Sequence, residues 1–246
     1  MEAKKIKQII KDKYGKIANS NAGCGCQCRC NDSEDISKEI GYSQEEINNV
    51  PEANLGLGCG NPIAHSRIKE GDVVLDLGSG AGFDSFLAAK KVGPAGKVIG
   101  VDMTQEMLNK AKANAKKYNY DNVEFRLGDI EDLSVEDNMI DVIITNCVIN
   151  LAPDKLKVFK EAYRVLKKGG RMYISDIVLL KQLTQEQRDN EELVTGCIGG
   201  AMLKDEYIET IKKSGFEVNV LNEDKDISKK QYQGLPLVSL SIEAIK

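Results

Sequence analysis

The sequence predicts an α/β protein with a Rossmann-like, seven-stranded, mostly parallel sheet and helices on both faces. From residue 71 onward, short continuous apolar runs alternate with segments of helical periodicity, a pattern typical of parallel strands buried on both sides. A glycine-rich loop joins the first of these strands to the helix that follows it. The chain has 246 residues, enough for one such domain with a small appendage.

The first 52 residues precede this pattern and predict a small helical, cysteine-rich extension. Residues 3–19 carry isoleucines spaced among charges, as in an amphipathic helix. Ser43-Gln-Glu-Glu46 matches a capping box, so a short helix is expected to begin there and to end near Pro51. We expect the lysines of the first helix to form a solvated face: Lys4, Lys5, Lys7, Lys11, Lys13 and Lys16.

Residues 53–178 form the predicted cofactor-binding domain and supply the first five strands. Helices are expected at 82–92, from Thr104 as the capping residue to near Tyr118, and at 154–167, where Gly169-Gly170 ends the last one. The five apolar runs that predict strands are 73–78, 97–102, 123–128, 140–146 and 171–178.

Residues 179–246 are expected to hold a substrate-binding insertion and the strands that complete the sheet. The insertion covers about 179–203 and precedes a helix at 204–214. The runs 217–221 and 237–245 are the last two predicted strands. Between them, the charged segment 222–230 predicts an exposed loop.

Composition and net charge limit the kinds of partner that this chain is expected to bind. The formal net charge is −4 and the isoelectric point is near 5.3, so the chain has no electrostatic attraction for nucleic acids. No apolar run approaches the roughly 20 residues that span a bilayer, and no signal peptide is recognised. We therefore expect a cytoplasmic protein without a membrane partner, whose seven cysteines are kept reduced. Nothing in the sequence demands an oligomer, and a monomer is expected.

The glycine-rich loop indicates a nucleotide-like cofactor. It begins at Asp76, and its glycines at 78, 80 and 82 allow a tight turn and close approach of the backbone to a ligand. The spacing is GxGxG rather than the GxGxxG of dinucleotide-binding proteins, which favours an adenosyl ligand without a pyrophosphate. Asp102 ends the second strand, where a carboxylate can bind ribose hydroxyls, and Asp129 follows the third, within reach of an adenine amino group.

This ordered set of a glycine-rich loop and two acids resembles the class I S-adenosylmethionine-dependent methyltransferases over about residues 60–220. The resemblance implies S-adenosylmethionine as the cofactor, with the loop at its methionine end and the two acids at ribose and adenine. The predicted cofactor-binding residues lie at the carboxyl ends of the first four strands: Asp76, Gly78, Ser79, Gly80, Gly82, Asp102, Met103, Gly128, Asp129, Ile130, Asn146 and Val148.

Three cysteines lie far apart in the chain, at Cys59, Cys147 and Cys197. Such spacing excludes a local zinc knuckle, which needs short CxxC-type pairs. Glycines flank Cys59 and Cys197, as expected for close backbone packing around a compact site. A soft, thiophilic element held by three converging thiolates agrees with this pattern.

The segments LGCGNP, NCVINLAPDK, EAYRVLKKGG, SDIV and TGCIGGA resemble the arsenite S-adenosylmethionine methyltransferases. That resemblance implies that Cys59, Cys147 and Cys197 bind As(III), with Cys147 facing the cofactor. It also implies arsenite and methylated trivalent arsenicals as substrates, and thioredoxin or glutathione as the reductant. No general base is expected, because trivalent arsenic attacks through a lone pair.

The run CGCQCRC places four more thiols at Cys24, Cys26, Cys28 and Cys30. In an extended chain these thiols would point to one face, which suits capture of a soft ion or attack on a disulfide. A tail that binds adventitious zinc is the other interpretation, and both remain open at this stage.

Two other functions fit parts of the sequence. A small-molecule C- or O-methyltransferase of the quinone-biosynthesis type shares the scaffold but has no use for three loop cysteines. A protein that sequesters or senses metalloids would use the cysteines but not the cofactor loop.

Overall fold

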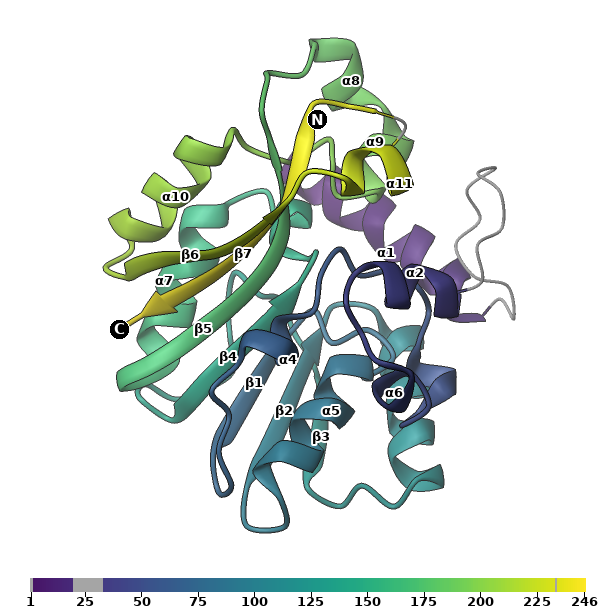
Figure 1. Cartoon of the computed structure of the whole chain (residues 1–246), viewed down its shortest axis with the longest axis vertical. Coiled ribbons are helices and arrows are strands. Elements are labelled where there is room, and N and C mark those ends of the chain that lie inside the picture. The colour runs from purple at the N-terminus through teal and green to yellow at the C-terminus, as the bar shows by residue number, and fades with distance from the viewer. Residues whose placement is uncertain (1, 20–32, 233) are drawn as a thin grey trace.

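The computed structural model describes residues 2–19, 33–232 and 234–246 and contains one seven-stranded sheet (Figure 1). The strand order is β3-β2-β1-β4-β5-β7-β6. The first five strands are parallel, while β7 runs antiparallel to both β5 and β6. The predicted mostly parallel sheet is confirmed, with these strands: β1 Val73–Leu77, β2 Lys97–Asp102, β3 Val123–Leu127, β4 Ile140–Asn146, β5 Leu166–Leu179, β6 Glu217–Asp224 and β7 Leu237–Ile245.

Helices cover both faces of the sheet because alternate residues of each strand point to opposite sides. Leu75 of β1 packs in one cluster with Phe159 of α7 and Tyr207 of α10. The neighbouring Val74 packs on the other face, with Leu87 of α5. The helices around the sheet are α4 Pro62–His65, α5 Phe83–Val92, α6 Gln105–Lys117, α7 Lys155–Val165 and α10 Lys204–Lys213, with a short 3-10 helix, η2, at Ile149–Leu151.

The extension before the sheet contains the predicted helix α1 (Ala3–Asn19), followed by α2 (Ser33–Glu39), α3 (Gln44–Ile47) and the 3-10 helix η1 (Pro51–Ala53). The capping box at α3 is present, since Ser43 and Glu46 each accept a hydrogen bond from the other's backbone amide. Lys4, Lys5, Lys11 and Lys16 are exposed as expected.

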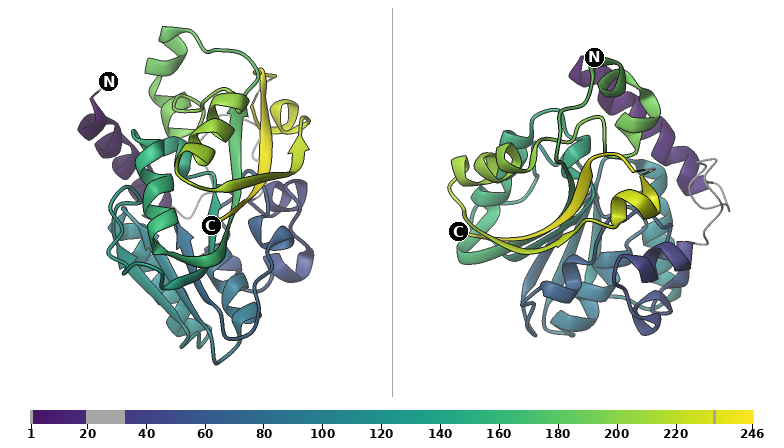
Figure 2. Two further views of the ribbon diagram at one scale, coloured as in Figure 1. Left: turned by 90° about the vertical axis from the view of Figure 1, so that its left-hand side faces the viewer. Right: turned by 45° about the horizontal axis from the view of Figure 1, so that its top comes forward.

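Helix α1 crosses the carboxyl edge of the sheet. It contacts α6 and α9, and Figure 2 shows it beside α9 at that end of the molecule. Ile10 is buried in the same apolar cluster as the three predicted ligand cysteines. The prediction of a solvated lysine face is wrong for Lys7, because the packing of α1 brings this side chain over the sheet edge, where it is paired with two carboxylates.

The C-terminal region adds α8 (Gln185–Asp189) and α9 (Glu191–Thr195) before α10, and α11 (Ile227–Gln231) before β7. The prediction of an exposed loop at 222–230 is wrong. Strand β6 continues to Asp224, and α11 buries Ile227 among the apolar residues around the cysteines. The high charge of this segment obscured the one buried isoleucine that anchors it.

One predicted helix boundary and one predicted capping interaction also differ. Helix α7 ends at Val165 rather than at Gly169-Gly170, because Leu166 already pairs with Ile140 of β4 as the first residue of β5. Thr104 stands at the start of α6, but its side chain forms no capping hydrogen bond. Within the described part of the chain, no helix is long and apolar enough to cross a membrane.

Candidate active site

A cavity opens at the carboxyl ends of β1, β2 and β4, where the glycine-rich loop, the two strand-end acids and α1 meet. All but one of the residues predicted to bind the cofactor line it: Asp76, Gly78, Ser79, Gly80, Asp102, Met103, Gly128, Asp129, Ile130, Asn146 and Val148. The exception is Gly82, which begins α5 with a φ of 94° and packs behind the loop against Phe86 and Phe125. Its role is to shape the loop.

The glycine-rich loop needs glycine at position 78 for two reasons. Its φ is 72°, in the left-handed region, and a Cβ there would lie 2.3 Å from Cγ2 of Val148. This close approach lets the loop that carries Cys147 and Val148 lie directly on the glycine-rich loop. The cofactor cavity and Cys147 therefore share one wall.

Asp102 is held in place by the backbone of the loop. One carboxylate oxygen accepts a hydrogen bond from the Gly80 amide at 2.9 Å, and the other accepts from the Thr104 amide at 2.8 Å. Burial raises the pKa of Asp102, although these backbone donors oppose the shift. The carboxylate is thus oriented beside the cavity before any ligand binds.

Two further groups test whether the cavity suits a polar adenosyl cofactor. The Ser79 hydroxyl is buried and forms no hydrogen bond with another described residue, so it is available to a ligand. Asp76 accepts a hydrogen bond from the Ser85 hydroxyl at 2.5 Å, and burial raises its pKa to about 8. A positively charged amine beside Asp76 would offset the cost of burying its negative charge. These residues therefore fit the methionine end of S-adenosylmethionine, which carries such an amine.

Asp129 is already paired with Lys7 of α1. The lysine ammonium lies 2.6 Å from Asp129 and 2.7 Å from Glu131. Burial alone would raise the pKa of Asp129, but the hydrogen bonds from Lys7 and from the Glu131 amide lower it overall. Lys7, Ile10 and Tyr14 line the cavity from α1, and the sequence analysis assigned none of them to the site.

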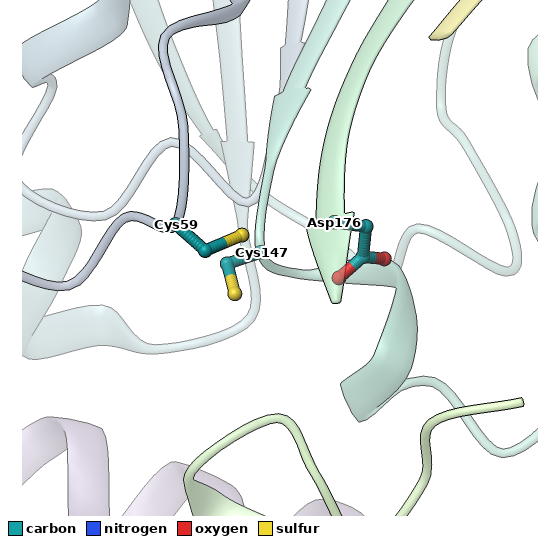
Figure 3. Close-up of side chains that lie close together, drawn as sticks. All are labelled: Cys59, Cys147 and Asp176. Carbon is teal, nitrogen blue, oxygen red and sulfur yellow. The ribbon is translucent and has the colours of Figure 1, made fainter. Parts of the chain in front are cut away.

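The three distant cysteines converge beside this cavity. Cys59, Cys147 and Cys197 are buried, with exposed fractions of 1%, 5% and 3%, and none forms a disulfide. The sulfurs of Cys59 and Cys147 and a carboxylate oxygen of Asp176 all lie within 4.8 Å of one another (Figure 3). The Cys197 thiol donates a hydrogen bond to the Cys147 carbonyl at 2.8 Å.

Two of these cysteines have an unusual backbone conformation. Cys147 has a φ of 58° and Cys197 a φ of 65°, both in the left-handed region that residues with a Cβ avoid. Such conformations cost about 1–3 kcal/mol each and cluster at functional sites. The surrounding fold therefore holds both thiols in place against a local backbone preference.

Glycines bring the Cys59 loop close to the sheet, as the sequence predicts. A Cβ at Gly58 would lie 2.8 Å from the amide nitrogen of Asn146, and one at Gly60 would lie 2.9 Å from the side chain of Ser175. Any larger residue would push the Cys59 loop away from the strand ends that carry the other site residues.

Comparison with known proteins agrees with this geometry. A family model described as a methyltransferase domain matches residues 68–215. The crystal structure of an arsenic(III) S-adenosylmethionine methyltransferase from Chlamydomonas reinhardtii has a TM-score of 0.64 and 34% identity, covering 86% of this chain and 73% of that one. This chain belongs to the arsenic(III) methyltransferase family. The family predicted from the sequence motifs is confirmed.

Curated arsenite methyltransferases are similar over most of the chain. The one from Halobacterium salinarum is 46% identical over 218 residues, 85% of this chain and 56% of the relative. The one from Aquipseudomonas alcaligenes is 44% identical over 178 residues, 70% of this chain and 51% of the relative. The chain thus spans little more than half the length of these curated family members.

The pKa values of the three cysteines are all raised, which favours their neutral thiol form. Burial raises the pKa of Cys59. Interaction with Cys147 and burial together raise the pKa of Cys197 well above its usual value. Cys197 lowers the pKa of Cys147, but Cys59 and burial outweigh it, so the net shift is strongly upward.

Asp176 is a further buried group at the cysteine cluster. Its carboxylate accepts hydrogen bonds at 2.9 Å from the Asn150 side chain, the Ile177 amide and the Tyr207 hydroxyl. Burial raises its pKa to about 7 despite these donors. The motif SDIV contains this residue, but its place inside a predicted strand gave no reason to assign it to the site from sequence alone.

Two tyrosines, one in α1 and one directly after α11, complete the surroundings of the thiols. Burial, followed by the nearby Cys197 and Cys147, raises the pKa of Tyr14 well above its usual value, and its hydroxyl donates to the Thr195 carbonyl at 3.2 Å. Burial and the three cysteines likewise raise the pKa of Tyr232. The remaining predicted site residues, Cys24, Cys26, Cys28 and Cys30, lie outside the described residues.

Proposed function

We propose that this protein transfers methyl groups from S-adenosylmethionine to trivalent arsenic bound by Cys59, Cys147 and Cys197. The observation that carries the proposal is the gathering of three buried thiols, none in a disulfide, in one cluster that reaches the cofactor cavity through Cys147. Cys147 is the shared residue, because it lines the cavity and also contacts the other two cysteines.

Loading of arsenite does not require ionised thiols in the free protein. Arsenous acid and three thiols give one tris-thiolate arsenic and three waters, since each thiol proton leaves with one arsenic hydroxyl. The reaction takes up and releases no net proton. The raised thiol pKa values are therefore compatible with binding, and the buried cluster exchanges polar S–H groups for As–S bonds with a soft element.

The residues of the chain mainly hold and orient the reactants. Asp102, the Ser79 hydroxyl and the glycine-rich loop would hold the cofactor with its reactive end toward Cys147. When bound, S-adenosylmethionine supplies a methyl group on a positively charged sulfur, an electrophile for the arsenic lone pair. The neighbouring apolar residues Ile10 and Leu151 exclude water from the cysteine cluster.

Methyl transfer raises arsenic formally from the trivalent to the pentavalent state. Two cysteine thiols can return two electrons by forming a disulfide and releasing two protons, and one external dithiol or two external monothiols then reduce that disulfide. We propose thioredoxin or glutathione for this role, and one or more of Cys24, Cys26, Cys28 and Cys30 as participants in capture or electron transfer. Arsenite and methylated trivalent arsenicals are the proposed substrates of a monomeric, cytoplasmic enzyme.

The two alternative functions explain less of the site. A quinone-type methyltransferase needs an apolar acceptor pocket and gives no reason for two cysteines with left-handed backbones. A protein that only sequesters metalloids gives no reason for the oriented Asp102 and the close-packed glycine-rich loop.

Arsenic speciation by liquid chromatography with mass detection tests the proposal. The protein is incubated with arsenite, S-adenosylmethionine and a thiol reductant, beside the Cys147→Ser variant. We expect methylated arsenic from the wild type alone, with cofactor binding retained in the variant. An absence of methylated arsenic from wild type that binds the cofactor, or equal products from the variant, would refute the proposal.

A further inference from the structure

The side chain of Asn146 forms hydrogen bonds with the backbone of Cys59 and of Gly60. Asn146 is the last residue of β4 and directly precedes Cys147. Its amide oxygen accepts a hydrogen bond from the Cys59 N–H at 3.1 Å, and its amide nitrogen donates to the Gly60 carbonyl at 2.8 Å. One side chain therefore joins the chain segment of the first ligand cysteine to that of the second.

A buried polar pair holds the Asn146 amide in this orientation. Its nitrogen lies 3.0 Å from the Tyr42 hydroxyl and 3.1 Å from a carboxylate oxygen of Asp84. The Tyr42 hydroxyl in turn donates to the other oxygen of Asp84 at 2.6 Å. The amide nitrogen thus faces acceptors and the amide oxygen faces the Cys59 donor, so a flipped amide would lose hydrogen bonds on both sides.

The Cys59 loop sits directly on this amide with no side chain in between. A Cβ at Gly58 would come within 2.8 Å of the Asn146 nitrogen, so glycine is what allows the contact. The Cys59 sulfur points from this loop toward the Ser175 carbonyl, 3.5 Å away, and the Cys147 amide donates to that same carbonyl at 2.8 Å. Asn146 and Ser175 together set the separation of the two thiols.

We infer that Asn146 is a positioning residue for arsenic, which holds Cys59 against Cys147 so that a third thiol reaches the metalloid. The inference rests on the proposed function and assigns Asn146 a role other than the predicted cofactor contact. Asp84 and Tyr42 also line the cofactor cavity, so the placement of Cys59 depends on the same cavity wall.

The test counts arsenic–sulfur bonds by X-ray absorption spectroscopy of the arsenite-loaded full chain. Asn146→Ala is compared with the matched control Asn122→Ala. Asn122 also uses its amide nitrogen to hold backbone carbonyls, those of Ala89 and Gly93, but at the opposite edge of the sheet. We expect three sulfurs around arsenic in the wild type and in the control, and two in Asn146→Ala.

Two binding measurements accompany the count in all three proteins. We expect unchanged affinity for phenylarsine oxide, which binds two thiols and can use Cys147 and Cys197. Calorimetry with S-adenosylmethionine reports whether the cavity wall that carries Asn146 stays intact. If Asn146→Ala does not fold, Asn146→Ser is used. The serine side chain is polar but too short to reach from β4 to the Cys59 amide.

The outcomes separate this inference from the proposed function. Three sulfurs in Asn146→Ala, or joint loss of cofactor and phenylarsine oxide binding in the folded variant, would overturn the positioning role and leave the proposed function standing. Fewer than three sulfurs in the wild type would overturn the three-cysteine site itself. A change from three to two sulfurs with the affinity for phenylarsine oxide retained would support the inference.

Discussion

Replacement of Gly78 by alanine tests the packing between the cofactor loop and the cysteine loop. The left-handed backbone at this position costs about 1–2 kcal/mol for a residue with a Cβ. The added Cβ would also lie 2.3 Å from Val148 Cγ2, a contact that requires one of the two loops to shift. Overpacking of this kind costs about 1–3 kcal/mol, so we expect a total loss of about 2–5 kcal/mol in the free energy of unfolding.

Gly169→Ala is the matched control for the cost of placing a residue with a Cβ in the left-handed backbone conformation. Gly169 has a φ of 79°, but nothing lies within 4 Å of the added Cβ, so only the conformational cost of about 1–2 kcal/mol applies. Urea denaturation gives both free energies, and calorimetry gives the affinity for S-adenosylmethionine. We expect weaker cofactor binding in Gly78→Ala alone. Equal destabilisation of the two variants, with equal cofactor affinity, would refute the argument from close packing.

Three further predictions follow from particular side chains. Asp102→Ala should weaken S-adenosylmethionine binding in calorimetry and leave arsenite binding nearly unchanged; parallel loss of both would contradict separate sites. Because the pKa of Asp76 is raised to about 8, the folded state holds a proton that the unfolded state loses near pH 4. Stability should therefore fall as pH rises from about 4 to 8, by at most about 1.4 kcal/mol per unit, and Asp76→Asn should flatten that slope in pH-dependent denaturation; an unchanged slope would contradict the shift. Ile227→Ala should lower the free energy of unfolding by about 2–5 kcal/mol in denaturation experiments, because the side chain is only 1% exposed. A loss below about 0.5 kcal/mol would instead support the exposed loop that the sequence predicted.

The arrangement of the sheet followed from local sequence signals. The apolar runs at β1, β2 and β4 are buried on both faces, and such runs separated by helices form parallel sheets whatever the rest of the chain does. The carboxyl ends of parallel strands share one edge, so the positions of Asp102 and Asn146 beside the cavity could be predicted from the strand ends alone.

Local signals failed where a contact distant in sequence decides the structure. Lys7 looks like one solvated lysine among several, and only the packing of α1 against α6 and α9 brings it to Asp129 and Glu131. The charged segment around Ile227 likewise has the composition of a loop, since one buried apolar residue leaves no periodic pattern to detect.

The sequence by itself determined the fold class, the cofactor cavity and the identity of the three converging cysteines. The fold class and the cavity depend on periodicity, on glycine spacing and on strand ends, which neighbouring residues specify. The set of three cysteines was implied by the resemblance of the surrounding motifs to the arsenite methyltransferases. Only the tertiary structure shows that burial raises the pKa values of the thiols, that Asp176 lies beside two of them, and that Asn146 forms hydrogen bonds with the Cys59 loop. Burial and hydrogen-bond geometry set these properties. Both depend on residues that lie far apart in the sequence and come into contact only when the helices pack on the sheet.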